Sequence, residues 1–328
     1  MEKTGNYHIY FDESQKIDSP EDIEYSFYGA FGVSISEKDE IEKDIKKIFK
    51  ELNTESELHF NQYKPGDLRK YFRVFNYLLS RDIAVNIFML NNNNYKELGS
   101  VLGLNIDTLK KHFYVKIPER LFYGIVRYQK NISNISVFMD QSTEYKTLKV
   151  YEKIKEQMNS HSLYRRKEYQ VLNVKGMASE NSTIIQSVDI IMGMIVFILD
   201  KKYLGTSKAT DAKSDLIYRV LLENNNLERV KKIITIFIWN SNTKNEDIEE
   251  YLISDSLNDF LLHMNKKDLK DSQIVQEAYI NVIKDEKLDP KEKSKKIKDY
   301  LNCSSGELYK YMGYLAGIEY NDRNKYIR

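Results

Sequence analysis

Short apolar runs alternate with amphipathic stretches along the first two hundred residues of the chain. Runs rich in β-branched and aromatic residues predict strands at 7–11, 25–34, 83–90, 135–139 and 169–174. Apolar residues that recur every three or four positions predict helices at 37–52, 67–80, 106–129, 145–160 and 184–203. The asparagine run 91–94 is interpreted as a polar loop. Strands that alternate with helices in this way predict an α/β fold, with a mixed β-sheet flanked by helices.

The pattern changes after residue 204. Residues 206–214 are polar without apolar periodicity, and we interpret them as a hinge. One more β-rich run follows at 233–239, and most of the remaining chain is charged amphipathic helix. We therefore predict a first domain over 1–204 and a mainly helical C-terminal region over 205–328, to which the sequence assigns no chemistry.

Composition narrows the classes of partner and cofactor. The 50 Lys and Arg against 49 Asp and Glu give a net charge of +1, so any binding of nucleic acid must depend on local basic patches. The single cysteine, Cys303, excludes an intrachain disulfide and cannot form a structural zinc site alone. The five histidines show no paired ligand spacing. With no apolar run of membrane length and no visible signal segment, we expect a cytoplasmic protein without membrane contact.

Three acidic residues stand out because each follows or interrupts an apolar segment. Asp12 ends the run 9–11, Asp140 ends the run 135–139, and Asp189 lies within the most apolar helix. A carboxylate in apolar surroundings costs free energy to desolvate unless a metal ion or another cation neutralises it. Hydrolysis of a phosphodiester needs an activated water and a neutralised phosphate, which two divalent ions roughly 4 Å apart supply. We therefore interpret the three aspartates as ligands of Mg²⁺ or Mn²⁺, which prefer oxygen ligands.

A fourth carboxylate, Glu57, lies between two predicted helices, with His59 two residues further on. In an extended stretch this spacing places both side chains on one face. We expect Glu57 to bind metal and His59 to assist proton transfer or orient water, as further catalytic residues. Near Asp189, Gln186 lies one turn before and Gly193 one turn after, and we expect the glycine to leave space beside the carboxylate.

Each acid also has an ordinary structural explanation. Asp12 and Asp140 could end strands and begin turns, and Asp140 could cap a helix. Asp189 could form a structural ion pair with an arginine or lysine. Glu13 should point away from the Asp12 face, because successive side chains of a strand alternate. Two acids at strand ends and one within a helix, taken together, favour a shared nuclease site.

Four short motifs carry a resemblance to a known family: Tyr10-Phe11-Asp12-Glu13-Ser14, Glu57-Leu58-His59-Phe60, Val137-Phe138-Met139-Asp140 and Gln186-Ser187-Val188-Asp189. Over residues 6–204 the chain resembles the bacterial and phage family called domain of unknown function 3800, which is related to RNase H-like nucleases. The resemblance implies an RNase H-like mixed sheet with a metal-dependent nuclease centre. In that centre Asp12 would lie on the first strand, Asp140 on an adjoining strand and Asp189 on a late helix, with Glu57 completing the site.

The chain departs from the family pattern at two positions. Gln15 stands where a glycine often follows the first motif, and His59 stands where a lysine is common. The resemblance also implies a role in phage defence or in a mobile element.

Basic side chains ahead of and within the strand at 169–174 are candidates for nucleic-acid contacts. Arg165, Arg166 and Lys175 could neutralise phosphates of DNA or RNA. Our first hypothesis is a nuclease with a two-metal mechanism. The alternative is a catalytically inactive RNase H-like scaffold that binds nucleic acid or a partner protein, and a third is a metal-dependent phosphatase or nucleotide hydrolase. The predicted helices after residue 240 could contact a partner protein or form a homodimer.

Overall fold

A computed structural model describes residues 5–14, 17, 23–127, 132–239, 249–282 and 290–303. Within these residues the strands form one seven-stranded sheet in the order β5-β4-β1-β2-β3-β6-β7. Neighbouring strands run parallel in β1/β4, β4/β5 and β3/β6, and antiparallel in β1/β2, β2/β3 and β6/β7. The strands are β1 (Gly5–Ser14), β2 (Tyr25–Ser34), β3 (Ala84–Asn91), β4 (Ile132–Asp140), β5 (Gln170–Met177), β6 (Ile234–Trp239) and β7 (Glu249–Tyr251). The predicted α/β class and mixed sheet are confirmed.

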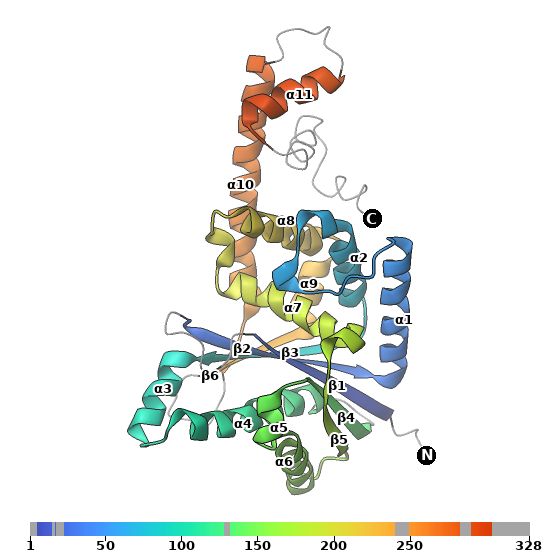
Figure 1. Ribbon diagram of the computed structural model, residues 1–328, viewed down its shortest axis with the longest axis vertical. Coiled ribbons are helices and arrows are strands. Elements are labelled where there is room, and N and C mark those ends of the chain that lie inside the picture. The colour runs from blue at the N-terminus through green and yellow to red at the C-terminus, as the bar shows by residue number, and fades with distance from the viewer. Residues whose placement is uncertain are drawn as a thin grey trace.

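Helices cover both faces of the sheet (Figure 1). One layer holds α1 (Ile35–Glu51), α2 (Leu68–Leu79), α7 (Thr183–Leu199), α8 (Lys208–Leu222) and α9 (Asn226–Ile233). The other holds α3 (Asn92–Val101), α4 (Ile106–Val126), α5 (Thr143–Thr147) and α6 (Val150–Tyr164). Strand side chains alternate between two hydrophobic cores: Tyr10 and Phe138 face the α7 layer, and Phe11 and Met139 face the α4 layer. Burial on both faces explains why β2 is almost continuously apolar.

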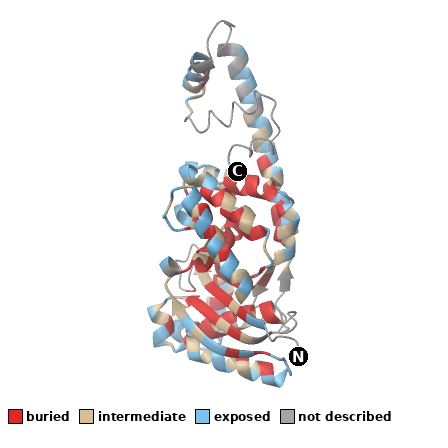
Figure 2. Cartoon of the chain, turned by 90° about the vertical axis from the view of Figure 1, so that its right-hand side faces the viewer, coloured by how far each residue is buried: buried red, intermediate tan, exposed pale blue. Residues whose placement is uncertain are grey.

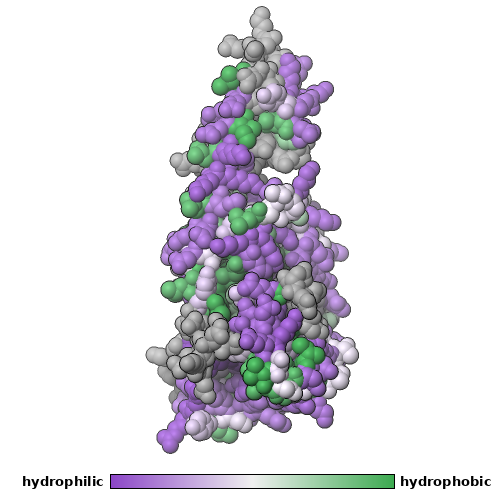
Figure 3. Space-filling model, turned by 90° about the vertical axis from the view of Figure 1, so that its left-hand side faces the viewer, coloured by the Kyte–Doolittle hydropathy of each residue, from purple (hydrophilic) through white to green (hydrophobic). Residues whose placement is uncertain are grey.

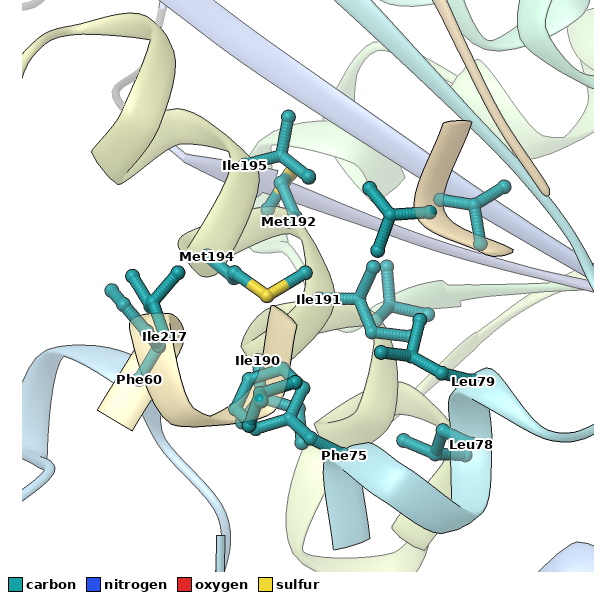
Figure 4. Close-up of a cluster of buried hydrophobic side chains, with 14 of the residues drawn as sticks. Phe60, Phe75, Leu78, Leu79, Ile190, Ile191, Met192, Met194, Ile195 and Ile217 are labelled. Carbon is teal, nitrogen blue, oxygen red and sulfur yellow. The ribbon is translucent and has the colours of Figure 1, made fainter. Parts of the chain in front are cut away.

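Helix α7 is the centre of the first core. Figure 4 shows its Ile190, Ile191 and Met194 among side chains from other elements, including Phe75 of α2 and Ile217 of α8. The helix approaches the sheet closely where β2 has a glycine. A Cβ atom on Gly29 would lie 2.9 Å from the sulfur of Met192. Because Gly29 pairs with Asp12 in the sheet, this approach brings α7 close to the acidic end of β1.

The chain after residue 205 belongs to the same sheet and core. Strand β6 pairs with β3, and Ile217 of α8 is buried in the α7 core. The predicted hinge at 206–214 is wrong, since α8 already begins at Lys208, with the Ser207 side chain capping its first turn. Among the described residues after 250 lie two further helices, α10 (Ile253–Val282) and α11 (Pro290–Leu301). Helix α10 begins against the core and then projects from the body, where Figure 2 shows it mostly exposed.

Two further local predictions need correction. The asparagine run is no loop, because the Asn91 side chain accepts hydrogen bonds from the amides of Asn93 and Asn94 and so caps α3. The single helix predicted over 145–160 is split into α5 and α6 at Lys149, which has left-handed backbone angles. Periodicity alone did not reveal either feature.

The described residues contain no helix that is long and apolar enough to cross a membrane. The face in Figure 3 is mainly hydrophilic, with hydrophobic side chains in small groups between the polar ones.

Candidate active site

Asp12 and Asp140 lie at the same end of two neighbouring parallel strands. The last paired residues of β1 and β4 are Phe11 and Met139, and the two aspartates come next. Alternation along the strands directs both carboxylates towards the α7 layer. Each accepts the backbone N–H of the following residue, at 2.8 Å for Asp12 and 2.9 Å for Asp140. Both line a cavity of about 450 Å³ at the strand ends, together with Glu13 and residues 141–145.

Asp189 of α7 is the third acid at this end of the sheet. Burial raises the pKa of Asp12 well above its ordinary value, and the negative charge of Asp189 is the next largest cause. The charges of Asp140 and Glu13 raise the pKa of Asp12 further, and the hydrogen bond from the Glu13 amide opposes them. Asp140 and Asp189, which are far from Asp12 in sequence, therefore lie close enough to raise its pKa.

The segment 57–60 is held against α7 by backbone hydrogen bonds. The Gln186 side chain accepts the N–H of Leu58 at 3.1 Å, and one turn later Asp189 accepts the N–H of Phe60 at 3.0 Å. Between them, the Tyr71 hydroxyl accepts the N–H of His59 at 2.9 Å and donates to its carbonyl at 2.9 Å. Every backbone N–H from Leu58 to Phe60 is thus satisfied by a side chain from α2 or α7, which fixes the segment.

This fixed segment places His59 between two carboxylates. His59 Nε2 lies 2.9 Å from Glu57 Oε2, and His59 Nδ1 lies 3.7 Å from Asp189 Oδ2. The expectation that Glu57 and His59 share one face is confirmed. Glu57 contacts His59, which in turn lies next to Asp189. The charge of Glu57 is not among the causes of the raised pKa of Asp12.

Burial is the largest influence on Asp189 and raises the pKa of its carboxyl group. The amide of Phe60 and the His59 ring oppose this shift, followed by the positive charge of Lys213. In place of the structural ion pair considered above, Asp189 has a backbone hydrogen bond and a histidine neighbour. The glycine one turn later does not leave open space, because a Cβ on Gly193 would lie 2.5 Å from the Cβ of Phe60. Gly193 makes room for Phe60, whose amide holds Asp189.

Glu13 points to the other side of the sheet, as strand alternation predicts. The hydroxyl of Tyr145, which belongs to the α4 core, donates to Glu13 Oε2 at 2.7 Å. Glu13 therefore contributes to the wall of the cavity at the strand ends rather than to the α7 side.

The basic residues proposed for nucleic-acid contact fall into two groups. Lys175 pairs in register with Phe138, so it lies on the same sheet face as Asp140, with its ammonium 5.1 Å from the Phe138 ring centre. Arg165 and Arg166 precede the first residue of β5, at the opposite end of the strands. At about 3.3 Å per residue along β4, that end is about 20 Å from Asp140. The structure therefore brings Lys175 towards the acids but not Arg165 or Arg166.

A second cavity of about 370 Å³ adjoins Asp189 and has lysines that the sequence did not indicate. Its polar lining includes Ser14, Asp189, Lys202, Thr210 and Lys213. Lys213 was not predicted because 206–214 has no apolar stripe and was interpreted as a hinge, and Lys202 falls at the end of the predicted helix 184–203. The helix-capping serine at 207 was the available signal for an ordered helix there.

The donor chemistry of the three aspartates suits Mg²⁺ or Mn²⁺, since hard cations prefer carboxylate oxygens. Mutual repulsion of the partly buried carboxylates also favours a cation among them. Among the residues that the structure describes, no group of three or more His, Cys, Asp or Glu side chains is already close enough to hold a metal ion. Mg²⁺ commonly uses one or two carboxylates, with water and substrate phosphate completing its shell, so the donor set fits this ion.

No protein-family model matches the chain, and no curated protein is similar to it at a significant level. The resemblance to the domain of unknown function 3800 family, and the RNase H-like character that it implies, remain predictions.

The hydroxyl of Tyr71 should stabilise the 57–60 segment. We expect Tyr71→Phe to lower the free energy of unfolding by about 1–3 kcal/mol, because it leaves the partly buried amide and carbonyl of His59 without their partner. Tyr164→Phe is the control, since Tyr164 is exposed at the end of α6; we expect a change of less than about 0.5 kcal/mol. Urea denaturation measures both, and equal losses would contradict the assigned role.

The raised pKa of Asp12 predicts a specific pH dependence. The folded protein binds a proton at Asp12 more tightly than the unfolded chain, so stability falls as pH rises from the ordinary value of 3.8 through the raised pKa. Asp12→Asn removes this loss, which is about 1.4 kcal/mol for each tenfold difference in proton affinity between the folded and unfolded states. We expect the variant to be more stable than the natural protein near neutral pH, with a smaller gain in acid.

Urea denaturation of both proteins across this pH range is the measurement. Asp82→Asn is the control, because Asp82 is exposed and precedes β3, towards the opposite end of the strands from Asp12. It should change stability by less than about 0.5 kcal/mol. A loss of stability in Asp12→Asn at neutral pH would show that the carboxylate is structural.

Proposed function

We propose that this protein is a metal-dependent nuclease that hydrolyses phosphodiester bonds in DNA or RNA. The observation that carries the proposal is that Asp12 and Asp140 follow the paired ends of two parallel strands and line one cavity, with Asp189 of α7 close enough to raise the pKa of Asp12. Partly buried carboxylates from two strands and a helix, which meet beside cavities, cost stability in the absence of a cation. Such perturbed groups are concentrated at functional sites.

Asp12, Asp140 and Asp189 are the residues that would hold Mg²⁺ or Mn²⁺. When bound, the ion would neutralise the phosphate charge and lower the pKa of a water molecule. The protein residues orient the site: the amides of Glu13, Gln141 and Phe60 each fix one carboxylate through a hydrogen bond. Fixed ligands lower the cost of organising the site when substrate arrives.

We assign His59 the transfer of a proton to or from a water or leaving oxygen beside Asp189. Histidine is the side chain whose ordinary pKa best suits proton transfer near neutral pH. Its hydrogen bond to Glu57 sets the orientation of the ring, so that Nδ1 faces Asp189. Glu57 thereby supports His59, and we propose this positioning role in preference to direct metal binding.

Cleavage assays on single- and double-stranded DNA and RNA, in Mg²⁺, Mn²⁺ or EDTA, test the proposal. We expect cutting only with metal, and a loss of more than about a hundredfold in Asp12→Asn and Asp140→Asn, since even outer partners of metal sites contribute about 10–100-fold. Asp82→Asn should keep full activity. Cutting that persists in EDTA, or in both site variants, would contradict the proposal.

A further inference from the structure

Lys213 of α8 reaches the candidate active site from a part of the chain to which the sequence assigned no chemistry. Its ammonium lies 5.0 Å from the centre of the Phe60 ring and donates to the carbonyl of Asn61 at 3.4 Å. These contacts hold it beside the residues that anchor Asp189. An ammonium group has three N–H donors. The bond to the carbonyl of Asn61 uses one of them, so other donors can bind a ligand.

The cavity beside Asp189 has the size and lining of a site for one anionic group. Its volume of about 370 Å³ lies within the usual range of roughly 300–1,000 Å³ for ligand pockets. Phe60, Val196 and Phe197 supply apolar wall, and the polar groups include Ser14, Thr210 and two lysines. This combination of apolar wall and a few convergent polar groups is typical of ligand sites.

The two lysines of this cavity repel each other. Burial lowers the pKa of Lys213, the charge of Lys202 lowers it further, and Asp189 opposes both. Lys202 is partly neutralised by Asp200, at 3.0 Å. Within the described residues Lys213 has no carboxylate within ion-pair distance, so its charge is available at the cavity. An anion between the lysines would relieve their repulsion.

We propose that Lys213, assisted by Lys202, binds a backbone phosphate of the nucleic-acid strand next to the phosphate that is cut. This inference rests on the proposed nuclease function and names one of its substrate contacts. The strand would pass from the cavity beside Asp189, across Asp12, to the cavity shared by Asp12 and Asp140. Helix α8 would then contribute to a substrate site whose acids all lie within residues 1–204.

Binding of fluorescein-labelled DNA and RNA oligonucleotides, followed by anisotropy across a salt series, tests this contact. Asp12→Asn serves as the parent, so that cleavage does not interfere. We expect Lys213→Gln to weaken binding about tenfold and to reduce the slope of log K against log salt by about 1, as for one lost phosphate contact. Lys202→Gln, which leaves the contacts to Phe60 and Asn61 intact, should weaken binding in the same direction.

Two controls separate charge from structure. Lys213→Arg keeps the charge and should retain most of the affinity, whereas Lys155→Gln, exposed on α6 across the sheet, should bind like the parent. In the active protein, Lys213→Gln should raise KM more than it lowers kcat. If Lys213→Arg binds as weakly as Lys213→Gln, the residue acts by holding Phe60 and the inference is overturned.

The two proposals fail in different ways. Parental binding and an unchanged salt slope in both glutamine variants would overturn the phosphate contact alone and leave the nuclease intact. If the parent binds no oligonucleotide of any kind, both proposals are overturned.

Discussion

The close packing of α7 against the sheet is the constraint on which the candidate site depends. Thirteen of its seventeen residues are buried, and the helix lies so near β2 that a Cβ on Gly29 would meet Met192 at 2.9 Å. This packing fixes Asp189 beside the end of β1. The same helix holds the 57–60 segment through Gln186 and Asp189. One apolar helix thus positions both a candidate metal ligand and the histidine next to it.

The acids at this end of the sheet work against stability. Burial and the repulsion of neighbouring carboxylates raise the pKa of Asp12, so ionisation of this group lowers the stability of the folded chain. Two other buried polar side chains have clear structural partners: Lys70 donates to Ser56, and Asn86 donates to the carbonyl of Leu121. The contrast supports a functional explanation for the aspartates, since functional sites commonly retain such unfavourable interactions.

Much of the fold and the choice of acids could be predicted from local pattern. Strand β2 matches its predicted range, and Asp12, Asp140 and Asp189 each stand out against apolar neighbours. The sequence could not predict the tertiary contacts. Among these are the position of His59 between Glu57 and Asp189, and the presence of Lys213 in the cavity beside Asp189. Arg165 and Arg166 were wrongly expected near the acids for the same reason. They precede β5, and the length of that strand separates them from the end of the sheet where Asp140 lies.

The central claim is that the three aspartates converge to bind a divalent cation. A crystal of the protein grown or soaked with Mn²⁺, measured for anomalous scattering, tests it most directly. The account predicts a peak about 2.1 Å from carboxylate oxygens of Asp12 and of at least one of Asp140 and Asp189, as for octahedral oxygen coordination. A fully occupied Mn²⁺ site elsewhere, with none at the end of β1, would contradict the account.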